Sequence, residues 1–200
     1  PTPTQTETQE DGYIEINYSA TDNVQISINT GYTENDTETT ENGSTDTRRV
    51  VVSDGIGVDT VYEADNVVNK WYDKSYSDSI ERKIIIKGYI GRFSVATTTK
   101  LKVKSVIIKS SRIDTMSLTF NGCSNMEICD LSEFDTSNVK SFERAFHSCS
   151  SLTALEVSHF NLSGILPFSE PFQYTFYGCS SITNSGIDFS NWSVDSICVE

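Results

Sequence analysis

Five cysteines and two histidines carry the most reactive side chains of this 200-residue sequence. Cys123, Cys149 and Cys179 recur 26 and 30 residues apart, and His147 stands two residues before Cys149. Residues two apart in an extended segment face the same side, so His147 and Cys149 have the types and spacing of a base and its nucleophile. The repeated spacing favours a structural role instead, because equivalent positions of a repeat stack inward on neighbouring coils.

The cysteines have three interpretations. Free cysteine is among the most buried residue types and packs as a small hydrophobic side chain, which favours a ladder in the core. A disulfide between neighbouring units and a metal site are the alternatives. The sequence has no Cys-x-x-Cys pair of the kind that holds zinc, and no hydrolase elbow, phosphate-binding loop or zinc-protease motif. We predict no catalytic residue, no cofactor and no metal ligand.

Asp54 and Asp59 flank a glycine-rich turn and are the best candidates for binding a hard cation. Their carboxylate oxygens are the ligands that calcium prefers, although the spacing is not that of an EF-hand. An Asp-Gly pair is also typical of a simple turn. Calcium at Asp54 and Asp59 is therefore left open.

Three lysines form the candidate contact with a partner. Lys100, Lys102 and Lys104 alternate with apolar residues, which predicts a strand with the lysines on one solvated face. The alternative to a plain solvated face is a docking surface for an acidic partner, and such docking would depend on salt.

The composition indicates which elements position these side chains. Isoleucine and valine number 33, against 12 for leucine and alanine together, and β-branched residues favour strands over helices. The sequence therefore predicts an all-β fold. The net charge of -13 argues against nucleic acid or an anionic membrane as partner, and no apolar run approaches the roughly 18 to 20 residues of a membrane span.

The charge is divided into three blocks. Residues 1–65 carry a net charge of -12, residues 66–115 carry +7, and residues 116–200 carry -8. Such asymmetry suggests different surfaces along one chain. The basic middle block is the most probable place for an electrostatic contact.

The patterning predicts three segments. Residues 1–11 contain no apolar side chain and are predicted to form a flexible acidic arm. Residues 12–95 contain short alternating strands separated by turn residues, which predicts an immunoglobulin-like β-sandwich. Residues 96–200 are predicted to form a solenoid of about three coils with a capping strand near residues 100–108, since stacked repeats need an atypical end unit.

Three repeat units support the predicted solenoid. Each has a phenylalanine three residues before the repeated cysteine, an apolar residue three after it and an aromatic residue eleven to thirteen after it. The members of these columns are Phe120, Phe146 and Phe176; Met126, Leu152 and Ile182; and Phe134, Phe160 and Trp192. The period is close to that of leucine-rich repeats.

The repeat resembles a known family. The run from Cys129 to Val139, read Cys-Asp-Leu-Ser-Glu-Phe-Asp-Thr-Ser-Asn-Val, and the later Phe-His-Ser-Cys-Ser-Ser-Leu from Phe146 to Leu152 are similar to the two linked motifs of BspA-like leucine-rich repeats. The resemblance covers about residues 115–200. Residues 50–55 and 83–88 resemble a degenerate PKD-like pattern, without its usual Trp-Gly-Asp.

These resemblances imply a function. BspA-like repeats occur in bacterial surface or secreted adhesion proteins and in some gut-phage virion components, often behind a PKD-like or immunoglobulin-like sandwich. We therefore predict a non-enzymatic structural and adhesion module, extracellular, on a cell surface or on a virion, that binds a protein or glycan partner. It is expected to bind no nucleic acid, and the interpretation includes a homo-oligomer or membership of a larger assembly. The alternative is an enzyme or accessory domain that acts on glycans or peptides through an unrecognised carboxylate site.

Overall fold

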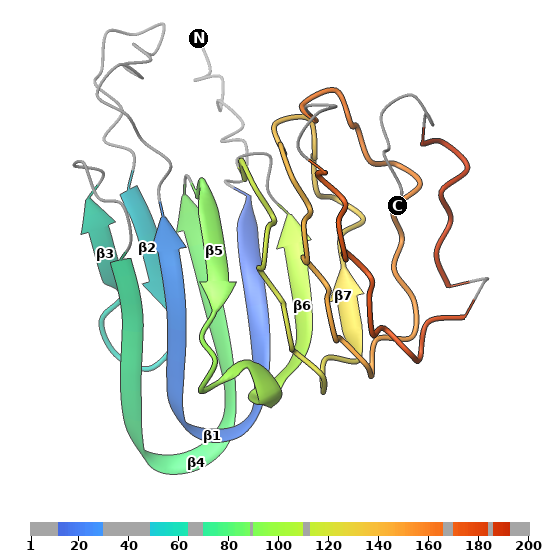
Figure 1. Ribbon diagram of the computed structural model, residues 1–200. Helices are drawn as coiled ribbons and strands as arrows, with labels where there is room; N and C mark the ends of the chain where they lie inside the picture. The colour runs from blue at the N-terminus through green and yellow to red at the C-terminus, as the bar shows by residue number, and fades with distance from the viewer. Residues whose placement is uncertain are drawn as a thin grey trace, which may run out of the picture.

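The computed structural model describes residues 12–29, 49–63, 70–88, 90–109, 113–165, 170–183 and 186–192. The predicted arm at residues 1–11 lies outside them. The prediction of an all-β chain is confirmed, and the described residues contain no α-helix. The elements are β1 (Tyr13–Asn29), β2 (Arg49–Ser53), β3 (Thr60–Glu63), β4 (Lys70–Gly88), β5 (Arg92–Val95), the 3-10 helix η1 (Lys100–Lys102), β6 (Val103–Lys109) and β7 (Ile128–Asp130) (Figure 1).

All seven strands belong to one mixed sheet. Their order is β3-β2-β4-β1-β6-β7, and β5 pairs with β1 outside this path. Apolar and polar residues alternate along β1, and the apolar set is buried. Because side chains of a strand alternate between its faces, this pattern commits one face of β1 to the core.

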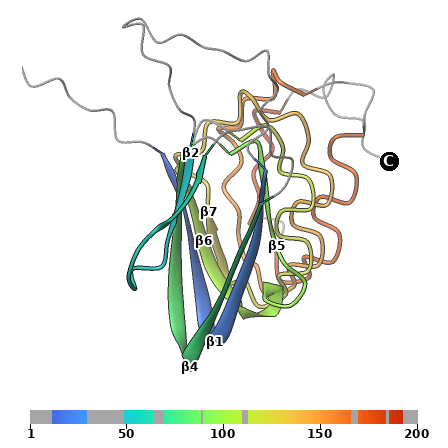
Figure 2. The same cartoon turned by 90° about the vertical axis from the view of Figure 1, so that its left-hand side faces the viewer.

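The sheet is folded on itself at a bend in its two longest strands. β1 and β4 both turn at the bottom of Figure 2 and form two arms that diverge upward. The pairing of β1 with β4 shifts register between Tyr18 and Asn23. There the Thr21 hydroxyl contacts both the carbonyl and the N–H of Asn23, at 2.6 and 3.2 Å. One bent, open sheet thus forms where a two-sheet sandwich was expected, and the finer assignment to an immunoglobulin or PKD type stays a prediction.

The repeat units stack through backbone hydrogen bonds. The N–H groups of residues 116, 118, 120 and 122 donate to the carbonyls of residues 141, 143, 145 and 147. Those of residues 142, 144, 146 and 148 donate to residues 171, 173, 175 and 177 in the same way. On another side of the stack, β6 pairs in parallel with β7, and Leu155 forms a parallel β-bridge with Ile187. Each unit is therefore one turn of the chain lying against the next.

Aromatic rings form a ladder inside the stack. The rings follow one another in the order Phe93, Phe120, Phe146 and Phe176. The centroids of neighbouring rings are 5.6 to 5.7 Å apart. Phe142 stacks in the same manner on Phe172. Such pairs add to the free energy gained by burying the rings.

The sheet and the stack share one core. A single cluster of buried residues runs from Ile14 in β1 to Ile165 in the repeats. β5 and β6 both pair with β1, and the Val95 N–H donates to the Thr119 carbonyl. Hydrogen bonds and packing therefore cross the predicted boundary at residues 95 and 96, and the division into separate domains stays a prediction.

Candidate functional site

The three lysines predicted to contact a partner occupy different local structures. Lys100 and Lys102 belong to η1, and only Lys104 lies on a strand, β6. The predicted single strand face is thus wrong in detail, because the strand begins at Val103. Lys104 pairs with Glu127 at 2.9 Å, and the Lys100 Nζ lies 2.7 Å from where a Cβ on Gly122 would stand. Their role in contacting a partner remains a prediction.

Asp54 is occupied by protein groups. Its Oδ1 accepts the Ile56 N–H at 2.9 Å, and its Oδ2 accepts the Tyr76 hydroxyl at 3.0 Å and pairs with the Lys74 ammonium at 2.5 Å. Partial burial would raise the pKa of Asp54, but hydrogen bonds from Lys74, Ile56 and Tyr76 outweigh it and lower that pKa. A calcium ion would have to displace Lys74, and Asp59 is exposed. The described residues include no group of three His, Cys, Asp or Glu placed to hold a metal.

The cysteines are packed as thiols. The four that the structure describes are free, and Cys198 lies outside the described residues. The Cys149 thiol donates to the Phe120 carbonyl at 3.2 Å. Burial raises the pKa of Cys123 to about 12 and that of Cys149 well above its ordinary value. The thiols therefore stay protonated, whereas a nucleophile needs a thiolate.

His147 does not pair with Cys149. Its ring stacks on Tyr177 with centroids 5.2 Å apart, and its Nδ1 lies 2.9 Å from the Ser148 hydroxyl. Cys149 has no exposed surface. The two side chains thus face opposite sides of the unit, and the candidate nucleophile and base are not brought together.

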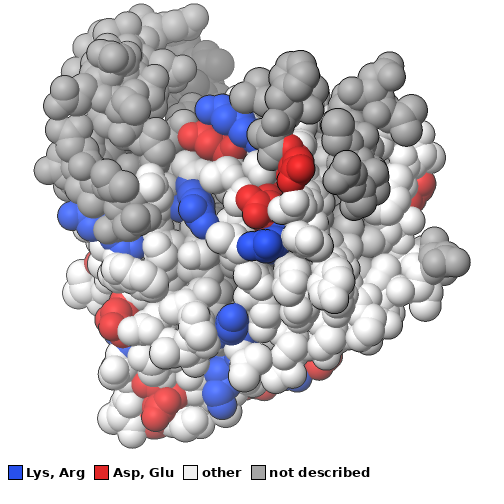
Figure 3. All heavy atoms as spheres, viewed as in Figure 1, with Lys and Arg blue, Asp and Glu red and all other residues white. Residues whose placement is uncertain are grey.

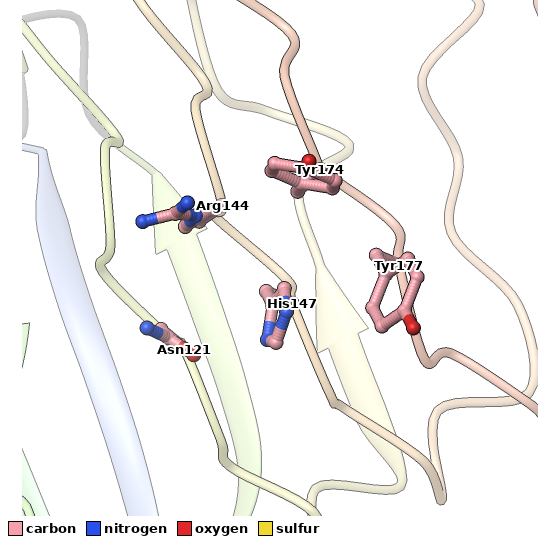
Figure 4. Close-up of a pocket in the computed structure, with 5 residues that line it drawn as sticks. All are labelled: Asn121, Arg144, His147, Tyr174 and Tyr177. Atoms are coloured by element: carbon pink, nitrogen blue, oxygen red, sulfur yellow. The ribbon is translucent and has the colours of Figure 1, made fainter.

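A hollow of about 270 Å³ opens on the outer surface of the stack (Figure 4). Its lining residues come from three successive units: Asn121, Arg144, His147, Tyr174 and Tyr177. They occupy two repeated positions, either two or five residues before the cysteine. The repeat thus gathers side chains that are up to 56 residues apart in the sequence.

Local backbone geometry turns these side chains outward. Phe120 and Phe146 are buried in the core, and Phe176 is partly buried against it. The side chain that follows each of them, Asn121, His147 or Tyr177, therefore faces the other side of the unit. Arg144 and Tyr174 have positive φ angles of 51° and 54°. That conformation costs about 1–2 kcal/mol for a residue with a Cβ. At Arg144, stacking hydrogen bonds on both sides hold it in place, from the Leu118 N–H to the Glu143 carbonyl and from the Arg144 N–H to the Gln173 carbonyl.

The hollow combines aromatic faces with one cation. Tyr174 and Tyr177 meet edge to face at 5.8 Å and are 49% and 64% exposed. The Arg144 guanidinium lies 5.2 Å from the centre of the Tyr174 ring. No carboxylate lines the hollow. Arg144 approaches Glu143 only at 3.9 Å, and its side chain donates no hydrogen bond to any described residue. Among the described residues, the donors of the guanidinium fork are thus not used in hydrogen bonds, although Glu143 forms a long ion pair with one of them.

A second hollow, of about 200 Å³, lies on the outer face of β1, β4 and β5. Trp71 and Arg92 line it, together with serine and asparagine side chains. The space-filling view shows lysines and arginines scattered among mostly uncharged residues, with no single basic patch (Figure 3). This face suits recognition by local contacts rather than by a broad field.

The sequence did not identify the hollow. Among its lining residues the sequence predicted a candidate role only for His147, as a base beside Cys149. The available signal was the repeat itself: when its columns are aligned, the outward positions collect Arg, His and Tyr. Finding the hollow required the inward and outward positions to be distinguished first.

Fold and site together define a β-rich repeat protein with an aromatic, cation-bearing hollow on its surface. Residues 92–198, just over half of the chain, match the family model described as "Mycoplasma protein of unknown function, DUF285". The chain belongs to this family, and the match begins at the first residue of β5. No curated protein and no solved structure shows significant similarity to the chain. Within the described residues, no helix has the length and apolar character needed to cross a bilayer.

Proposed function

We propose that the protein is a non-enzymatic structural and adhesion module, displayed on a bacterial surface or a phage virion, that binds a protein or glycan partner. The observation that carries this proposal is the hollow built from Arg144, Tyr174 and Tyr177. Exposed aromatic rings beside a few polar groups are typical of recognition sites.

The repeat supports the same proposal. The motifs from Cys129 to Leu152 resemble BspA-like leucine-rich repeats, and the family match is compatible with a β-rich surface repeat protein. We propose that the stack is a short solenoid of this type and that the bent sheet is a distant form of the PKD-like or immunoglobulin-like sandwich. Assembly into a homo-oligomer or a larger particle belongs to this proposal.

The enzymatic alternative has less support from the described residues. A glycosidase would need a pair of carboxylates at its cleft, but carboxylates line neither hollow. Of the four described thiols, those of Cys123, Cys129 and Cys149 are buried, and burial raises the pKa of all four.

The test is binding of the purified full chain to an array of glycans and to immobilised extracellular matrix proteins. A double variant, Tyr174→Ala with Tyr177→Ala, is expected to lose at least about tenfold in affinity, because aromatic anchors dominate binding energy. Ile128→Ala, which removes an exposed apolar side chain from β7, is the matched control. Unchanged binding by the double variant, or turnover of the bound glycan or protein, would refute the proposal.

A further inference from the structure

We infer that the hollow lined by Asn121, Arg144, His147, Tyr174 and Tyr177 binds a sugar that carries a carboxylate group, as in an acidic glycan. This inference rests on the proposed function and names the ligand class for the same site.

Arg144 provides the contact for the carboxylate. A guanidinium fork binds a carboxylate with two parallel charge-assisted hydrogen bonds. The side chain is held on one side by the Tyr174 ring at 5.2 Å, and Glu143 is too distant, at 3.9 Å, to satisfy its N–H groups. Arg144 is thus positioned before a ligand arrives, and less side-chain entropy is lost on binding.

The aromatic rings provide the contact for the sugar ring. His147 and Tyr177 stack with an angle of 18° between their planes, and Tyr174 stands at 87° to Tyr177. Two walls at nearly a right angle therefore border the hollow, as Figure 4 shows. An apolar face of a sugar can pack on one wall, and the Asn121 amide can both donate to and accept from hydroxyl groups.

A sugar fits this site better than an extended acidic peptide. Peptides usually add to an unpaired sheet edge or lie in a long groove. The backbone N–H groups of the first two units beneath the hollow are already used between units, as at Phe120, Arg144 and Phe146, so no peptide strand can pair between those units. At about 270 Å³ the hollow is slightly below the usual range of ligand pockets, and this size suits one ring at the end or within a glycan.

The local charge selects for an anion despite the acidity of the chain. The net charge of -13 repels anions at long range, but charges beyond about 8 Å are largely screened at physiological ionic strength. Among the lining residues the Arg144 guanidinium is the one permanent charge, and Glu143 forms a longer ion pair with it at 3.9 Å from outside the lining. A ligand carboxylate that accepts two hydrogen bonds from the guanidinium competes with that longer contact. A ligand with a carboxylate gains this contact, whereas a neutral sugar of the same shape does not.

The experiment titrates the full chain separately with glucuronate, with glucose, which lacks the carboxylate, and with N-acetylglutamate amide, which lacks the sugar ring. Binding is measured by calorimetry and by changes in the NMR signals of the His147 ring and the Asn121 amide. Arg144→Gln removes the charge, and Arg144→Lys keeps it without the fork. Arg92→Gln makes the same change in the second hollow and serves as the matched control. Circular dichroism confirms that each variant is folded.

Glucuronate is expected to bind at least about tenfold more tightly than glucose. Arg144→Gln should lower the affinity for glucuronate about ten- to a hundredfold and the affinity for glucose little. Arg144→Lys should recover part of the lost affinity for glucuronate. Arg92→Gln should leave both affinities unchanged. The inference is overturned by no glucuronate binding at millimolar concentration, by equal binding of glucose or of N-acetylglutamate amide, or by an unaffected Arg144→Gln variant. If Arg144→Gln is neutral while the double tyrosine variant loses its partner, the ligand class is wrong and the adhesion proposal stands.

Discussion

Repeated cysteines hold a repeated polar contact in the core. The Cys149 thiol donates to the carbonyl of Phe120, and the Cys179 thiol donates to that of Phe146. Each thiol therefore satisfies a carbonyl of the preceding unit, which a purely apolar side chain would leave without this donor. This contact accounts for a cysteine at positions where other apolar residues also fit.

The buried thiols predict a loss of stability in alkali. Burial raises the pKa of Cys123 to about 12, whereas an unfolded thiol titrates near about 8.5. The stabilisation is thus complete below about pH 8.5 and is lost as pH rises toward 12. Urea titrations should show the free energy of unfolding falling by up to about 1.4 kcal/mol per pH unit for each such thiol. Cys123→Ala should fall less steeply, and an identical slope would contradict the burial of this thiol.

At the position just before each cysteine, we predict that two substitutions change the stability in opposite directions. Gly122, Ser148 and Gly178 all have positive φ, at 81°, 59° and 77°. Gly178→Ala should lose about 1–2 kcal/mol, because its Cβ would also lie 3.2 Å from the Ser148 Cα. Ser148→Gly should gain up to about 1 kcal/mol by relieving the same conformation. Thermal unfolding measures both, and a stabilised Gly178→Ala variant would show that the turn is not left-handed.

At the scale of elements, one carboxylate joins the turn after β2 to β4. Asp54 receives Lys74 and Tyr76 from β4, and the Arg82 guanidinium stacks on the Tyr76 ring at 3.9 Å. The turn at Asp54, for which calcium and a simple turn were both left open, is thus connected to the neighbouring strand β4 by these side-chain contacts.

Asp54→Asn should destabilise the protein by about 1–2 kcal/mol near neutral pH, since it weakens two charge-assisted contacts. The pKa of Asp54 is lowered in the folded state, so its stabilisation is present above about pH 3.9 and is lost as pH falls through the lowered value. The difference from the parent should therefore shrink in acid, as measured by urea unfolding. Asp59→Asn, at an exposed site, is the control. A constant difference at all pH values would rule out the ion pair as its cause.

The elements differ in how well the sequence predicted them. The alternation of β1 was legible because Ile14, Ile16, Val24 and Ile26 repeat with period two. The bend could not be predicted, because it depends on a register shift between β1 and β4, and these strands lie some 55 residues apart in the sequence. The inward columns of the repeat could be predicted, but the hollow could not, because its shape depends on ring orientations at Tyr174 and Tyr177 that spacing does not specify.

At the scale of the whole molecule, the charge blocks meet inside one fold. The basic middle block pairs with acidic residues on either side of it in the sequence. The pairs are Lys74–Asp54, Lys83–Glu15, Lys104–Glu127 and Lys109–Glu133. Part of the segregated charge is therefore compensated within the chain, although the exposed pairs, Lys104–Glu127 and Lys109–Glu133, add little stability.

The shared core predicts that the sheet and the repeat stack unfold together. Hydrogen exchange followed by mass spectrometry should give amides of β1, of β6 and of the stack between Phe120 and Leu152 the same opening free energy, equal to the global free energy of unfolding. The reason is that β6 pairs with β1 on one side and β7 on the other. A lower value confined to the repeats would instead favour two domains with a boundary near residue 96.

The hydrogen bonds between units also determine which backbone groups residues 172–178 present. The bonds donated by residues 116–122 and 142–148 each run from an N–H of one unit to a carbonyl of the next, and residues 171–177 accept the last of them, whereas the Ser151 N–H donates back to the Ser124 carbonyl. The last of these segments therefore presents the N–H groups of Phe172, Tyr174, Phe176 and Gly178, for which no described residue supplies an acceptor. Two copies meeting along this edge would set donors against donors. The polarity of the backbone thus disfavours pairing of this segment with the same segment of a second copy, a hazard that sheet proteins usually avoid with charges or bulges on their edges.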